Sequence, residues 1–236
     1  NASAAPNASL TKVFSVSAED NSNTATPTAA KFTVTVVSTN DLPIVDLNGS
    51  GSGNNNSISF TEVDGADNAS AAVALVASGA NLSDADSANL AKLEISIPTS
   101  GAGGVQAGDQ LIITQSGSDK VIDLGFTSDV TTPATNMVSF GSTTFSAILT
   151  VAGGKQLVTL QPSKDVGGTQ TLIANSTGAV KADFESLLDA IKFNNSSNGT
   201  LSEAGRALTI DVTDTGGAST AVAANVAVSV TAVNDT

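Results

Sequence analysis

Along most of this chain apolar residues alternate with polar ones, which is typical of strands that bury one face. The clearest runs are 31–36 and 226–231, where Val or Phe occupies every second position. The same reasoning predicts strands over 57–62, 71–76, 92–97, 110–115, 120–124, 137–140, 146–151, 156–161, 207–212 and 225–233. Gly and Asn clusters at 48–56, 100–104, 153–154 and 167–168 separate these runs and indicate turns.

The period of the pattern changes between Ala179 and Ala190. Phe184, Leu187, Leu188 and Ile191 stand at i, i+3, i+4 and i+7, which predicts one face of a short helix. The sequence therefore predicts an all-β fold: an antiparallel Greek-key β-sandwich of cadherin or immunoglobulin type, with one short helix near 179–190. Such domains usually have about 100 residues, and the chain, with 236 residues, is much longer. We therefore expect inserted hairpins between about 104 and 175.

One stretch of sequence occurs twice. Residues 14–41 align with residues 208–235 at an offset of 194 without a gap, and each copy ends in Asn-Asp. The identical pairs are Asp20/Asp214, Thr26/Thr220, Ala29/Ala223, Ala30/Ala224, Val34/Val228, Val36/Val230, Asn40/Asn234 and Asp41/Asp235. We therefore predict that 1–41 is the C-terminal pair of strands of a preceding repeat and that 42–236 is one complete repeat. Since two strands alone are marginal in water, either upstream sequence or another subunit must complete the first pair.

The amino-acid composition argues against several classes of function. The 236 residues include no Cys and no His, which excludes disulfides, thiolate or imidazole metal sites, Cys or His nucleophiles and the usual general base. The net charge of −13 would repel nucleic acid, and no apolar run reaches the roughly 20 residues of a membrane span. The absence of Tyr and Trp argues against a sugar cleft, so we expect no enzyme. The chain begins with Asn and shows no signal peptide, so we expect a piece of a longer protein.

Acidic residues gather at the ends of the predicted strands: Asp41 in the linker, Glu62 closing a run, the pair Asp84 and Asp86, and Asp214 before two glycines. Calcium takes six to eight oxygen ligands, mostly carboxylates and carbonyls. A D-x-D pair on extended backbone points both carboxylates to one side. Asp, Asn and Gly are also ordinary turn formers, and the residues alone leave both interpretations open.

Several motifs together resemble the cadherin-like repeats, including the VCBS type, of large secreted bacterial adhesins of the RTX class. The motifs that carry the resemblance are Asn40-Asp41-Leu42-Pro43, Asn234-Asp235, Phe60-Thr61-Glu62, Leu82-Ser83-Asp84-Ala85-Asp86-Ser87, the block from Ala182 to Asn195, Arg206-Ala207-Leu208-Thr209 and Asp214. The resemblance implies a calcium site at the junction with the preceding module, formed by Asn40, Asp41, Asp84, Asp86 and Asp214. It also implies that Glu62 faces the next junction together with Asn234 and Asp235.

These expectations combine into a non-enzymatic, calcium-rigidified structural repeat of a long protein on the bacterial cell surface. Its partners would be neighbouring repeats of the same chain or identical subunits. A first alternative is a self-assembling filament or surface-layer subunit joined by strand donation, which the strand pair within 1–41 suggests. A second alternative is a carbohydrate-binding adhesin module whose partner is a surface glycan.

Overall fold

The computed structural model describes residues 9–17, 29–37, 39–63, 72–197 and 201–233, and strands dominate it. The strands are β1 Ser9–Val16, β2 Ala30–Val37, β3 Ile44–Asp46, β4 Asn56–Thr61, β5 Val73–Ala74, β6 Asn81–Ser83, β7 Asn89–Pro98, β8 Asp109–Ile113, β9 Lys120–Asp123, β10 Met137–Phe140, β11 Thr143–Ala152, β12 Lys155–Val166, β13 Thr169–Leu172, β14 Ala179–Val180, β15 Ile191–Asn195, β16 Arg206–Asp214 and β17 Ala224–Thr231. The helix α1 spans Lys181–Asp189.

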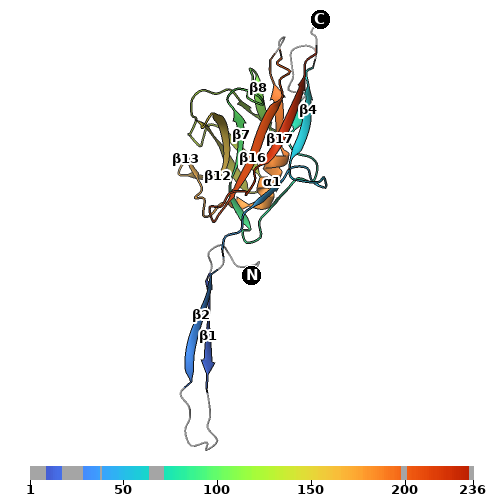
Figure 1. The fold of residues 1–236 in the computed structure, drawn as a ribbon. Helices are drawn as coiled ribbons and strands as arrows, with labels where there is room; N and C mark the ends of the chain where they lie inside the picture. Colours follow the sequence, from blue (N-terminus) through green and yellow to red (C-terminus); the bar gives the residue numbers. More distant parts are fainter. Residues whose placement is uncertain (1–8, 18–28, 38, 64–71, 198–200, 234–236) are drawn as a thin grey trace, which may run out of the picture.

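A nine-stranded sheet forms the larger layer, in the order β10-β11-β12-β7-β16-β17-β4, with β13 paired to β12 and β14 paired to β7. The neighbours along this path are antiparallel except β17 and β4, which run parallel side by side (Figure 1). In β17 every second residue, from Ala224 to Val230, is buried, as period-two alternation requires.

A four-stranded sheet, β5-β15-β8-β9, faces the larger sheet across the core. Phe60 of β4 and Phe193 of β15 meet edge to face, with ring centroids 5.6 Å apart. The helix packs on the same side, since Phe184 contacts Phe145 of β11 with a centroid separation of 4.9 Å. A further short antiparallel pair consists of β3 and β6. It contacts the helix, since the backbone N–H of Leu82 in β6 donates to Oε1 of Glu185 at 3.1 Å.

Strands β1 and β2 form a separate antiparallel sheet, which we call the N-terminal ribbon. It projects from the pole of the sandwich opposite to the one where β17 ends (Figure 1). Every β2 side chain is exposed, and so is every β1 side chain from Leu10 onward. The rings of Phe14 and Phe32 stack 5.0 Å apart on this exposed surface.

The predicted all-β sandwich with one short helix is confirmed, and antiparallel hairpins β8–β9, β10–β11, β11–β12 and β12–β13 occupy the region where insertions were expected. The helix begins at Lys181 because the two preceding residues pair with β7. The parallel β4–β17 pair departs from a purely antiparallel sandwich. The Greek-key connectivity stays a prediction. No helix in the described ranges is long and apolar enough to cross a membrane.

Candidate functional site

The pole of the sandwich next to the ribbon brings together Asn40, Asp41, Asp84, Asp86 and Asp214, which we call the junction cluster. Pairing of β3 with β6 lays the linker beside the loop that follows β6. Pairing of β16 with β7 places the end of β16 at the start of β7, directly after that loop. Three segments far apart in sequence therefore meet because of the sheet register.

Two main-chain contacts hold the D-x-D loop in shape. One oxygen of Asp84, Oδ1, accepts the backbone N–H groups of Asp86 at 3.0 Å and of Ser87 at 2.7 Å. The Oδ2 atom of Asp86 accepts the backbone N–H of Asp41 at 3.2 Å, which ties the linker to the loop. These bonds are those of an Asx turn. The turn uses one carboxylate oxygen of Asp84, Oδ1, and leaves the other, Oδ2, out.

On the other side, the linker is tied to the turn after β16. The side-chain amide nitrogen of Asn40 donates to Oδ2 of Asp214 at 2.7 Å, and the backbone N–H of Ala218 donates to Oδ1 at 2.9 Å. Asp214 is fully buried. A Cβ atom at Gly216 would overlap the side-chain amide of Asn40, so the present position of that amide depends on glycine at 216.

Three oxygen atoms of the cluster are left without a hydrogen-bond partner. They are Oδ1 of Asn40, Oδ2 of Asp84 and Oδ1 of Asp86, and each is almost inaccessible to solvent. A buried acceptor without a donor costs about 1–3 kcal/mol, more when it is charged. A cation, a water molecule or another donor would satisfy such atoms.

The carboxylates of the cluster also lie close enough to affect one another's charge. Burial raises the pKa of the Asp84 carboxyl above its ordinary value of 3.8, and the neighbouring carboxyls of Asp86 and Asp214 raise it further against the opposing backbone hydrogen bonds. Among the described residues, the ion pairs are Lys92–Glu94 and Arg206–Asp109, which leave the cluster out. The ammonium of Lys181 donates to the backbone carbonyl of Asp84 at 3.1 Å.

The donor set fits calcium in kind, because it consists of two carboxylate oxygens and one amide oxygen, all hard ligands. The exposed Asp41 adds a carboxylate at the edge of the cluster. Within the described part of the chain, no three acidic side chains by themselves form a group that could hold a metal ion. The amide oxygen of Asn40 is the member of the donor set that is not a carboxylate.

Glu62 lies at the opposite end of the large sheet. It is buried, and its Oε2 accepts the backbone N–H of Val233 at 3.0 Å. Asn234 and Asp235, the other residues predicted for that junction, lie outside the described residues. The structure thus places Glu62 away from the junction cluster, and its role at the next junction stays a prediction.

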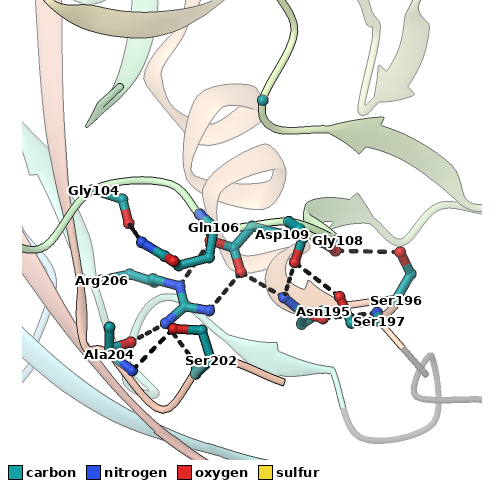
Figure 2. A network of polar contacts seen from close by, with 12 residues as sticks. Gly104, Gln106, Gly108, Asp109, Asn195, Ser196, Ser197, Ser202, Ala204 and Arg206 are labelled. Atoms are coloured by element: carbon teal, nitrogen blue, oxygen red, sulfur yellow. Dashed lines mark hydrogen bonds and ion pairs between the residues drawn. The ribbon is translucent and has the colours of Figure 1, made fainter. Parts of the chain in front are cut away.

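A buried polar network around Arg206 and Asp109 was not predicted from the sequence (Figure 2). The guanidinium of Arg206 binds both carboxylate oxygens of Asp109, at 2.7 and 3.0 Å, and both side chains are completely buried. Asp109 also accepts the side-chain amide of Asn195 at 2.7 Å and the backbone N–H of Gln106 at 2.8 Å. Arg206 begins β16 in the large sheet, whereas Asp109 and Asn195 belong to the four-stranded sheet. The network therefore clamps the two layers together.

The remaining donors of Arg206 bind the backbone carbonyls of Ser202 and Ala204. A signal for this network was present in the sequence. Arg206 shares the parity of Leu208 and Ile210, the buried positions of its strand, and a charged residue on a buried parity requires a buried partner.

Two open clefts lie away from the junction cluster, with volumes of about 690 and 680 Å³. The first runs over β4, β17 and the start of β16 and is lined mainly by Ser, Ala and Gly. The second lies near Gln106, Phe126 and Gln156. Neither is lined by a carboxylate among the described residues.

Comparison with known proteins adds no relative: no protein-family model, no curated protein and no solved structure matches the chain.

Proposed function

We propose that this chain is a non-enzymatic structural repeat of a long extracellular protein on the bacterial surface, and that calcium rigidifies its junction with the preceding module. The observation that carries the proposal is the set of orphaned oxygens on Asn40, Asp84 and Asp86. These residues belong to the linker and to the loop after β6, which the hydrogen bond from Asp41 to Asp86 ties together. The cysteine-free, acidic composition supports an extracellular location, and the resemblance to bacterial adhesin repeats supports the role.

The function follows from charge. Without a cation, the carboxylates of Asp84, Asp86 and Asp214 repel one another, and Asp41 adds a further negative charge at the linker. A bound calcium ion neutralises this repulsion and bridges the linker to the loop after β6. Asn40, Asp84 and Asp86 would hold the ion, with Asp41 at the rim. The linker then has one orientation relative to the sandwich, and successive modules form a stiff rod.

The test is a calcium titration of the whole chain, followed by calorimetry and thermal unfolding together. An ion that binds only the folded state stabilises it by RT ln(1 + [L]/Kd), about 2.7 kcal/mol at a hundredfold excess over Kd. The double variant Asp84→Asn/Asp86→Asn should lower the affinity for calcium by about tenfold or more, since it removes two of the expected charged ligands.

The matched control is Asp119→Asn/Asp165→Asn, which changes the net charge equally at two exposed positions away from the junction. It should bind calcium as the parent does. Calcium binding that is equally tight in the junction double variant would show that the ion, if any, is held elsewhere. Magnesium serves as a second control, because it requires a small octahedral site and keeps its waters.

A further inference from the structure

The N-terminal ribbon repeats the end of the sandwich in three dimensions. Shifted by 194 positions, each of the five Cα pairs that join β16 to β17 occurs again between β1 and β2. For example, Leu208 lies opposite Val226, and Phe14 lies opposite Phe32. A slip of one residue would exchange the two faces of a strand, so this agreement of register is a strong constraint.

The faces agree as well as the register. In β16 and β17 the residues Leu208, Ile210, Val226 and Val228 are at most 2% exposed because they face the core. Their counterparts in the ribbon are Phe14, Val16, Phe32 and Val34, which share one face and are 41–57% exposed. Leu10 and Val36 extend the same face. The ribbon therefore presents a core face that nothing in the described chain covers.

One charged side chain lies on that apolar face. Lys12 is opposite Val34, in the position that Arg206 has opposite Val228. Arg206 is fully buried against Asp109. By charge complementarity, the surface that covers the ribbon carries an acidic residue opposite Lys12.

Both edges of the ribbon are also open within the described residues. In the sandwich, the corresponding edges are closed by β7 next to β16 and by β4 next to β17. Three features are thus specified for the occupant: a strand for each edge, a second sheet over the apolar face, and a carboxylate at the position of Asp109.

We propose that the ribbon docks as the last two strands of a preceding module of the same fold, which lacks its own counterparts of β16 and β17 and precedes the ribbon in the chain. A second copy of the present chain does not fit, because its own β16 and β17 fill that place in its core. Two ribbons stacked face to face do not fit either, because each would bury a Lys12 on an apolar face. This inference deepens the proposed function and rests on its repeat organisation, but not on calcium.

The experiment reconstructs the missing module from this chain. Residues 42–205 are fused directly to residues 12–236, so that β1 and β2 take the places of β16 and β17 in the first module at the observed register. The control is a tandem of two intact repeats, residues 42–235 fused to residues 42–236. Amide hydrogen exchange of residues 12–16 and 30–37 is measured in the fusion and in the present chain, with calcium and with EDTA.

In the fusion we expect ribbon amides to exchange at least about a hundredfold more slowly than in the present chain, and binding of a hydrophobic dye to fall. Protection should persist in EDTA. Lys12→Arg in the fusion should preserve it, whereas Lys12→Glu, which meets Asp109, should abolish it. Deletion of Lys12 should also abolish it, because the deletion turns the apolar face outward.

Two results would overturn the inference. The first is a control tandem that folds in both repeats while the ribbon amides of the fusion exchange as fast as in the present chain. The second is self-association of the present chain that protects the ribbon and is lost in Phe14→Ser/Phe32→Ser, which would identify a second copy as the occupant. A fusion that folds while Asp84→Asn/Asp86→Asn leaves calcium binding intact would refute the calcium site alone.

Discussion

The side-chain amide of Asn40 donates a 2.7 Å hydrogen bond to the fully buried carboxylate of Asp214, 174 positions further along the chain. This bond fixes which way the amide points: its nitrogen is engaged, and its oxygen is the orphaned atom. One linker residue thereby joins the turn after β16 to the proposed ion position.

Replacing Asn40 by Asp should make the junction more dependent on calcium. In EDTA the new carboxylate meets Asp214 without a donor between them, and we expect a loss on the order of 2 kcal/mol in unfolding free energy. In saturating calcium the loss should shrink, because a carboxylate is a stronger ligand than an amide. Urea unfolding with and without calcium measures both values. Asn54→Asp, at an exposed position, is the charge-matched control; equal losses in both conditions would place the ion away from Asn40.

Replacing Gly216 by Ala should disturb the junction without changing any charge. The added methyl group overlaps the side-chain amide of Asn40, which must move from its place beside Asp214. We expect calcium affinity to fall by about tenfold or more, while destabilisation in EDTA stays near 1 kcal/mol. Gly205→Ala is the control, since its Cβ would meet only ordinary contacts. If calorimetry finds the same calcium affinity in Gly216→Ala as in the parent, Asn40 is not a ligand.

The raised pKa of Asp84 predicts an unusual pH dependence. Because burial raises the folded-state pKa above the unfolded value, the folded state binds the proton more tightly, and this group stabilises the calcium-free protein as pH falls through the raised pKa. The melting temperature of the parent minus that of Asp84→Asn, measured in EDTA, should therefore rise between about pH 7 and about pH 4. Calcium affinity should fall over the same range. A difference that falls with acid would contradict the crowding of Asp84.

The buried pair of Asp109 and Arg206 should dominate the stability of the sandwich. Asp109→Ala leaves a buried guanidinium and the donors of Asn195 and Gln106 without an acceptor, so we expect a loss of about 3–5 kcal/mol. Arg206→Met should cost less, because Asp109 keeps those two donors. A double-mutant cycle by urea unfolding gives the coupling energy.

The control for this cycle is the pair of Lys92 and Glu94. Its atoms are 3.8 Å apart and about a third of each side chain is exposed, so Lys92→Met should cost no more than about 1 kcal/mol. Similar losses from Lys92→Met and Asp109→Ala would mean that the buried network adds no specific stability.

Much of the fold could be predicted because its main strands bury one face. Residues 137–140 form β10 as predicted, and the helix follows the spacing of Phe184, Leu187 and Leu188. The short strands β3, β6 and β13 were not predicted; β3 and β6 have three residues each, too few to show a period. The parallel partner of β17 was also beyond prediction, since alternation identifies a buried face but not the neighbouring strand.

The candidate site, too, could be predicted only in part. Asn-Asp and D-x-D could be recognised as candidate ligands from residue type and spacing. That Asn40 would point its nitrogen at Asp214 depends on the contact of three distant segments, which the sheet register decides. The partner of Arg206 lies 97 positions away and follows from no local pattern.

The parallel pairing of β4 and β17 has a mechanical consequence. The chain enters β4 at Asn56, beside Val226, and leaves β17 at Thr231, beside Thr61. Tension applied between the two ends of the chain therefore pulls these neighbouring strands in opposite directions along their length (Figure 1). The ladder is loaded in shear, so its hydrogen bonds share the force and must break together rather than one after another. A protein tethered at both poles thus resists extension through the geometry of its backbone, before any ion contributes.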